Sequence, residues 1–217
     1  MRTERIILGI DPGLNTTGYG VVDISSGHAK LLEAGIVRSS SKTLQGRIKE
    51  IYDGVAEVIA AFHPDVLALE QLYSLYKRPI TAILMGHARG AICLAAEQAG
   101  IPVVSYAATK IKKTMTGSGH APKDQMQRAV QRELRLSQIP EPPDVADAIA
   151  IALCHFTEAQ QTLKFGNRSS VLSVDDFAAL TKLSKSKTPL SSLPKELKKG
   201  APGRVRMTAV KRTPPRP

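Results

Sequence analysis

The sequence predicts an α/β fold in which helices cover both faces of a mixed five-stranded sheet. Three short apolar runs, at residues 6–10, 66–69 and 103–106, are typical of buried strands. Between them, apolar residues recur at three- and four-residue steps, which is the spacing of one helix face. Three strands at the start of the chain, followed by a β-α-β-α-β alternation, indicate the mixed sheet.

The first three strands are predicted to form an antiparallel meander, because turn residues separate residues 6–10, 18–24 and 31–37. A helix over residues 44–62 follows, and Pro64 stops it. Its apolar face consists of Leu44, Ile48, Ile51, Val55, Val58, Ile59 and Phe62.

A long helix over residues 80–99 is closed by Gly100 and precedes the third buried strand. Two further helices are predicted near residues 123–134 and 145–156. The apolar stripe of the helix 80–99 is wider than one sheet face needs. We therefore expect this helix to form most of the interface of a twofold homodimer.

The charge of the chain is concentrated at its C-terminal end. The net charge is +11, from 30 Lys and Arg against 19 Asp and Glu, which favours a polyanionic partner such as nucleic acid or an acidic membrane surface. Residues 157–217 contribute 13 basic and 4 acidic residues, so 1–156 carry only +2. We expect a folded domain over 1–157 and a basic, mostly disordered tail over 158–217, with a short helix at 174–183.

Several classes of protein are disfavoured by the sequence. Cys93 and Cys154 lie alone in apolar stretches without CxxC or CxxH spacing, so we expect buried thiols in a reducing compartment and no zinc site. The first residues lack the apolar stretch of a signal peptide, and no window approaches 18 uninterrupted apolar residues. These features predict a cytoplasmic protein that does not span a membrane.

Four carboxylates occupy the ends of predicted elements. Asp11 ends the first buried strand, Glu70 ends the second, and Asp144 and Asp147 begin the last helix on one face. Each has a structural alternative, since Asp11 could form a turn before Pro12 and Asp144 could cap a helix. If the two strands are neighbours, Asp11 and Glu70 emerge at the same edge of the sheet.

Converging carboxylates repel one another unless a cation lies between them. Ligand sets made only of oxygen favour Mg²⁺ or Mn²⁺ over zinc. Two such ions roughly 4 Å apart can clamp the attacking and leaving oxygens of a phosphodiester. Acidic residues of this kind in a basic protein therefore predict a phosphate-containing substrate.

The order and spacing of four motifs resemble the RuvC family of Holliday-junction resolvases over residues 5–157. The first motif is Ile7-Leu8-Gly9-Ile10-Asp11-Pro12-Gly13, continued by Thr17-Gly18-Tyr19-Gly20-Val21-Val22. The others are Leu69-Glu70-Gln71, Gly86-His87-Ala88-Arg89-Gly90-Ala91 and Asp144-Val145-Ala146-Asp147-Ala148-Ile149-Ala150. The resemblance implies a ribonuclease H-like fold and a homodimer that uses Mg²⁺ to nick two opposed strands of a four-way DNA junction. It also implies the RuvA–RuvB branch-migration complex as a partner.

The resemblance also assigns site residues. Asp11, Glu70, Asp144 and Asp147 match the family's catalytic carboxylates, the third of which varies between Asp and His. Lys123 matches a basic residue near the scissile phosphate, where a cation stabilises developing charge. Its alternative is an exposed residue in a first helical turn, where a cation is slightly unfavourable.

Two further positions match DNA-contacting residues of the family. Lys112 matches a basic position, and Tyr73 matches an aromatic position, usually Phe, that can stack on an unpaired base. Tyr73 and Tyr76 have the alternative of being ordinary loop aromatics. The resemblance does not extend to the tail.

Two other functions stay open from the sequence. The Gly-Ile-Asp-x-Gly pattern of the first strand also resembles phosphate-binding loops of sugar kinases and Hsp70-type ATPases. Those proteins need a duplicated domain, for which residues 1–156 are too short. A junction-binding protein without catalytic activity is the second alternative, although it would not need all four acidic positions.

Overall fold

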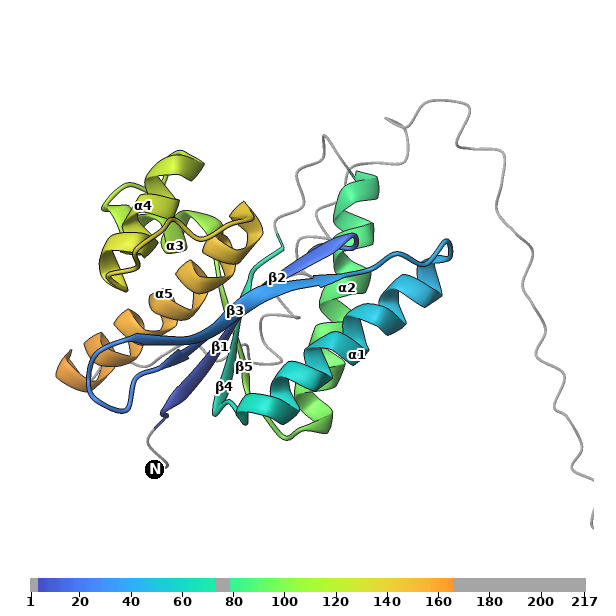
Figure 1. The fold of residues 1–217 in the computed structure, drawn as a ribbon, viewed down its shortest axis with the longest axis horizontal. Helices are drawn as coiled ribbons and strands as arrows, with labels where there is room; N and C mark the ends of the chain where they lie inside the picture. Colours follow the sequence, from blue (N-terminus) through green and yellow to red (C-terminus); the bar gives the residue numbers. More distant parts are fainter. Residues whose placement is uncertain (1–3, 73–78, 166–217) are drawn as a thin grey trace, which may run out of the picture. The chain divides into compact units, whose positions relative to one another are not determined.

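The computed structural model describes residues 4–72 and 79–165, which form a sheet between two layers of helices (Figure 1). The strands are β1 (Ile6–Asp11), β2 (Thr16–Asp23), β3 (Lys30–Arg38), β4 (Val66–Glu70) and β5 (Val103–Tyr106). The helices are α1 (Leu44–Phe62), α2 (Pro79–Gln98), α3 (Ala108–Thr116), α4 (Lys123–Glu133) and α5 (Pro143–Phe165). The mixed five-stranded sheet and its two helical layers confirm the predicted fold class.

The strand order β3-β2-β1-β4-β5 places β1 at the centre of the sheet. β1 pairs antiparallel with β2, and β2 pairs antiparallel with β3, as expected for a meander. β4 lies parallel to β1, and β5 lies parallel to β4. Because Ile10 is in register with Leu69, the next residues, Asp11 and Glu70, leave the sheet side by side.

Alternate residues of the central strands build two separate cores. Leu8 and Leu67 belong to the core that α1 and α2 cover, whereas Ile7 and Val66 belong to the core beneath α5. Figure 1 shows α1 and α2 on one side of the sheet and α3, α4 and α5 on the other. Burial on both faces explains why β1 and β4 are continuous apolar runs.

The ends of α1 agree with the sequence prediction. Its N-cap residue, Thr43, accepts a hydrogen bond from the backbone N–H of Gly46 at 3.2 Å. Its C-cap residue, His63, has φ of 47° and donates its N–H to the carbonyl of Ile59. Pro64 follows and prevents a further turn.

Two glycines allow α5 to lie unusually close to the sheet. A Cβ atom on Gly9 would stand 2.2 Å from the carbonyl oxygen of Ala148, and one on Gly18 would stand 2.1 Å from that of Asp144. Both distances are too short for any side chain. The absence of side chains at these positions of β1 and β2 therefore determines where the first turns of α5 lie.

Two features of the helical layer differ from the sequence prediction. α3 was not predicted, because its only regular apolar signal is the pair Ile111 and Met115, and Ile111 alone is buried. α5 extends to Phe165, nine residues beyond the predicted end at 156. Its later turns hold Glu158, which pairs with Lys110 of α3 at 2.6 Å, so tertiary contacts continue past the change in composition. The domain boundary at 157 stays a prediction, and the predicted helix 174–183 lies outside the described residues.

Within the described part of the chain, α2 is the one helix whose length and composition would let it cross a membrane. Ala88, Ile92 and Ala96 are buried and belong to the core shared with α1 and the sheet. Only 28% of the apolar stretch Ile80–Gln98 is buried, however. These contacts are those of a core helix, and the exposed apolar side of α2 needs another explanation.

Candidate active site

The four predicted carboxylates come from three elements at one end of the sheet. Asp11 and Glu70 are the last residues of the adjacent parallel strands β1 and β4. Asp144 and Asp147 lie in the first turns of α5, which the contact with Gly18 holds against β2. Gly18 is itself the register partner of Asp11, so the start of α5 lies beside the end of β1.

The turn after Asp11 is held by a buried threonine. The Thr17 hydroxyl donates to the carbonyl of Gly13 at 2.8 Å and accepts from the Gly13 N–H at 3.4 Å. A Cβ atom on Gly13 would stand 2.2 Å from the carbonyl oxygen of Thr16, so the turn requires glycine there. Local contacts thus determine the shape of this short turn and the path of the backbone that follows Asp11.

A cavity of about 260 Å³ opens between these carboxylates and the helices α3 and α4. Its acidic residues are Asp11, Glu70 and Asp147, and its basic residues are Lys112 and Lys123. Apolar side chains complete the lining, namely Ala108, Ile111, Met126 and Ile151. Asp144 does not line the cavity, although its charge acts on Asp11.

The electrostatics of the cavity oppose ionisation of its acids. The pKa of Asp11 is raised to about 7, first by burial and then by repulsion from Glu70, Asp147 and Asp144, while Lys123 opposes the rise. Burial and repulsion from Asp147 also raise the pKa of Glu70. The carboxylates therefore share one electrostatic site, as the sequence predicted.

The two predicted lysines lie at the same cavity. Lys123 is the first residue of α4, and its Nζ lies 3.5 Å from Oδ2 of Asp147. Its side chain is 71% exposed, so it is accessible to a ligand entering the cavity. Lys112 reaches the cavity from α3, the helix that the sequence pattern did not reveal. Tyr73, the predicted stacking residue, lies outside the described residues.

The donor set fits a hard divalent cation. Its oxygens are all carboxylate oxygens, and a bound cation would offset both burial and mutual repulsion, the two causes that raise the pKa of Asp11. Among residues 4–72 and 79–165, no three His, Cys, Asp or Glu side chains lie close enough to hold an ion in the conformation described. Metal binding thus requires these side chains to draw together.

Arg89 also contacts a residue of this site, although no pattern in the sequence assigns it a role. Its guanidinium donates from Nη1 to the main-chain carbonyl of Glu70 and from Nη2 to the hydroxyl of Ser105 at 2.5 Å. The signal available in the sequence was a single charge in the middle of the apolar helix 80–99. Its partners could not be deduced, since they come from β4 and β5.

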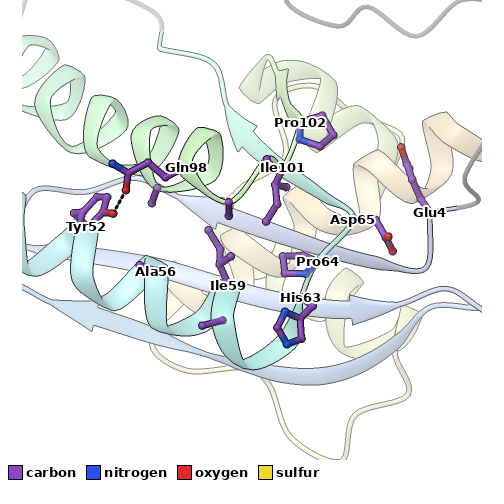
Figure 2. A pocket seen from close by; sticks show the side chains of 14 residues that line it. Glu4, Tyr52, Ala56, Ile59, His63, Pro64, Asp65, Gln98, Ile101 and Pro102 are labelled. Carbon is purple, nitrogen blue, oxygen red and sulfur yellow. Dashed lines mark hydrogen bonds between the residues drawn. The ribbon is translucent and has the colours of Figure 1, made fainter.

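A larger cavity, of about 710 Å³, lies between the C-terminal ends of α1 and α2 (Figure 2). Several of its polar groups already have partners within the fold. Asp65 accepts from the N–H groups of Arg5 and Ile6, and Gln98 accepts from the hydroxyl of Tyr52. The smaller cavity, where like charges meet, is therefore the candidate active site.

Comparison with known proteins identifies the family. The model of the family described as crossover junction endodeoxyribonuclease RuvC matches residues 7–155. The chain belongs to the RuvC family. The RuvC of Rhodopirellula baltica is 58% identical over 149 residues, which are 68% of this chain and 84% of that protein. The RuvC of Tolumonas auensis is 46% identical over 158 residues, which are 73% of this chain and 90% of that protein.

Solved structures agree with this assignment. The structure described as Thermus thermophilus RuvC in complex with Holliday junction substrate is 35% identical, with a TM-score of 0.68. The match covers 72% of this chain and 96% of that chain. The yeast mitochondrial Holliday junction resolvase Ydc2 is 14% identical with a TM-score of 0.53, and this likeness concerns the fold alone. The RuvC motifs recognised in the sequence and the ribonuclease H-like fold are thus confirmed.

Proposed function

We propose that this RuvC-family protein is a Mg²⁺-dependent endonuclease that resolves Holliday junctions by paired, symmetric nicks in opposed strands. The observation that carries the proposal is the convergence of Asp11, Glu70 and Asp147 in one cavity, with Asp144 close enough to affect Asp11. The proposal continues the activity named for the relatives.

The residues of the cavity would have different roles in the reaction. Asp11, Glu70, Asp144 and Asp147 would hold two Mg²⁺, or Mn²⁺ in their place. When bound, such ions activate a water molecule and neutralise charge on the scissile phosphate. Lys123, exposed beside Asp147, is placed to stabilise the charge that develops on the phosphate. Lys112 provides a second positive charge for the DNA backbone at the wall formed by α3.

The competing functions have less support. An ATPase of the sugar-kinase or Hsp70 type needs two related domains, whereas the family match occupies residues 7–155 as one domain. A junction-binding protein without activity would have no use for carboxylates that repel one another at a cost to stability.

The decisive experiment compares cleavage and binding of a four-way junction in carboxylate variants. Asp11→Asn, Glu70→Gln and Asp147→Asn should each abolish Mg²⁺-dependent cutting while junction affinity changes little, because basic surface provides most of the affinity. Asp144→Asn should be severely impaired, and Asp144→His should retain part of the activity.

Asp53→Asn is the matched control, since Asp53 lies on the exposed side of α1 and forms an ion pair with Lys49 of the same helix. This variant should cut at the wild-type rate. A wild-type rate in any of the carboxylate variants would remove that residue from the proposed site, and cutting by the wild-type protein without divalent metal would contradict the mechanism.

A homodimer formed through α2 is part of the proposal. The exposed positions Ile80, Ile83, His87, Gly90 and Leu94 follow one another at alternating steps of three and four residues. This is the spacing of a helix-packing seam. Ile80, Ile83 and Leu94 are 72%, 60% and 52% exposed, and a Cβ atom on Gly90 would meet nothing within 4 Å. A second α2 related by a twofold axis would cover this seam and supply the second site that a symmetric junction requires.

Location and partners complete the proposal. A protein that acts on chromosomal DNA junctions would work in the cytoplasm of a bacterial cell. The RuvA–RuvB branch-migration complex stays a predicted partner, on the basis of family membership alone. The net charge of +9 in residues 166–217 would add to non-specific attraction to DNA.

A further inference from the structure

We propose that Arg89 is a positioning residue that holds the main chain of Glu70 in place for metal binding. Its two hydrogen bonds join the carbonyl of Glu70, at the end of β4, to the side chain of Ser105 in β5. The arginine itself comes from the middle of α2. The guanidinium of Arg89 thus links α2, β4 and β5 at Glu70, the last residue of β4.

Glu70 lies at the end of its strand, where the sheet restrains the main chain less than in the middle. The ladder between β4 and β5 pairs Glu70 with Tyr106, and its last hydrogen bond runs from the N–H of Gln71 to the carbonyl of Tyr106 at 2.8 Å. β4 ends at Glu70, so this bond is the last that the ladder makes to the peptide group after Glu70. The bond from Arg89 to the carbonyl of Glu70 adds a second restraint on the same peptide group.

A purely structural role accounts poorly for a charged group at this place. Burial lowers the pKa of Arg89, which reports the cost of removing the guanidinium from water. A well-packed apolar side chain of similar size generally stabilises a protein at least as well as a buried charge. Arg89 instead offers two donors in a fixed planar arrangement, which is the property that positioning requires.

The inference rests on the proposed function, because Glu70 must be a metal ligand for its position to matter. Residues that orient a metal ligand typically contribute 10- to 100-fold to metal affinity. Arg89 would act in this way through the backbone of Glu70. It touches neither the metal nor the DNA in this account.

The test is metal binding by the full-length protein, with Mn²⁺ as the probe and isothermal titration calorimetry as the readout. Arg89→Met keeps the length and apolar volume of the side chain but removes both donors. We expect it to weaken Mn²⁺ binding by about tenfold or more, and to raise the Mg²⁺ concentration for half-maximal junction cleavage, while the melting temperature changes little. Arg89→Lys retains one charged donor group, and its loss of Mn²⁺ affinity should be smaller.

Ile92→Ala is the matched control, because Ile92 is fully buried on the same helix and contacts the core. It should lower the melting temperature and leave Mn²⁺ affinity unchanged. Wild-type Mn²⁺ affinity in Arg89→Met, or an equal loss of affinity in Ile92→Ala, would overturn the inference. If Arg89→Met does not fold, Arg89→Lys and Ser105→Ala are measured as two single variants. Wild-type Mn²⁺ affinity in both of them would overturn the inference. Failure of the proposed function can be told apart from failure of the inference about Arg89. If the proposed function is wrong, Glu70→Gln will bind Mn²⁺ and cut junctions like the wild type.

Discussion

At the scale of one residue, the buried carboxyl of Asp11 lowers the free energy of unfolding when it is ionised. Its pKa rises from 3.8 to about 7, mainly because it is buried and then because three other carboxylates repel its charge. The protonated form is thus favoured in the folded protein. Between pH 4 and pH 7 the folded state keeps Asp11 largely protonated, whereas the unfolded chain ionises it, so a rising pH favours the unfolded state. Stability without metal should therefore fall as the pH rises through this range, by up to about 4 kcal/mol.

Asp11→Asn should consequently be more stable than the wild type in metal-free buffer at pH 8. The gain in the free energy of unfolding should shrink towards zero at pH 4, where the wild-type carboxyl is already protonated. Urea unfolding at several pH values in the presence of EDTA measures both quantities. Asp53→Asn, on the exposed side of α1, should show no such gain. A gain of equal size at pH 4 and pH 8 would contradict an electrostatic origin.

The sequence was informative about residues whose position follows from the end of an element. Asp11 and Glu70 could be paired in advance because each ends a buried apolar run, and parallel neighbours end at the same edge. Arg89 could not be assigned in this way. Its role depends on Glu70 and Ser105, which are separated from it by 19 and 16 positions along the chain. No local pattern encodes a bond between a side chain and a distant carbonyl.

At the scale of elements, the strands and four of the five described helices were predictable, whereas α3 was not. The bounds of α1 match the prediction because a periodic apolar face and a following proline both indicate the same helix. α3 has nine residues and one buried side chain, so its periodicity is too weak to detect. It is stabilised by contacts with α4 and α5 that only the fold reveals. The missed helix carries Lys112, and family resemblance rather than periodicity located that residue.

The seam of α2 gives a prediction about assembly. Ile83→Glu would place two like charges at a twofold interface, one from each protomer, and should shift the protein from dimer to monomer at micromolar concentration. Sedimentation velocity measures the shift, and a junction assay should show nicks in the two strands becoming independent. Leu32→Glu is the control, since Leu32 is a 39% exposed apolar residue of β3, away from α2. A dimer of unchanged stability in Ile83→Glu would exclude this interface.

At the scale of the whole molecule, most of the net positive charge and the proposed catalytic residues lie in different parts of the chain. Residues 1–165 carry a net charge of +2, obtained as +11 minus the +9 of residues 166–217. The carboxylates of the site belong to the part that is nearly neutral. We therefore expect the DNA to be attracted by the tail and by lysines at the cavity such as Lys112 and Lys123, which lie beside its acids. We expect the tail to contribute affinity and the domain to contribute cleavage.

Truncation after Phe165 separates these contributions. The cut is placed there, and not at 157, because Glu158 pairs with Lys110 and the side-chain amide of Gln160 donates to the carbonyl of Gly27 at 3.3 Å. The truncated protein should melt near the temperature of the full chain and cut junctions at low salt. Its junction affinity should be weaker and less sensitive to salt, since each lost phosphate contact lowers the salt dependence by about 0.9.

A full-length variant carrying Lys195→Gln, Lys198→Gln and Lys199→Gln distinguishes charge from chain length. If the tail acts through its charge, this variant should show part of the same loss of affinity and of salt dependence. Fluorescence anisotropy with a labelled junction between 50 and 200 mM salt gives both values, over a range in which such contacts change affinity strongly. An insoluble truncated protein, or one that fails to cut at low salt, would mean that residues beyond Phe165 belong to the folded domain, because loss of DNA attraction alone is compensated when screening is weak.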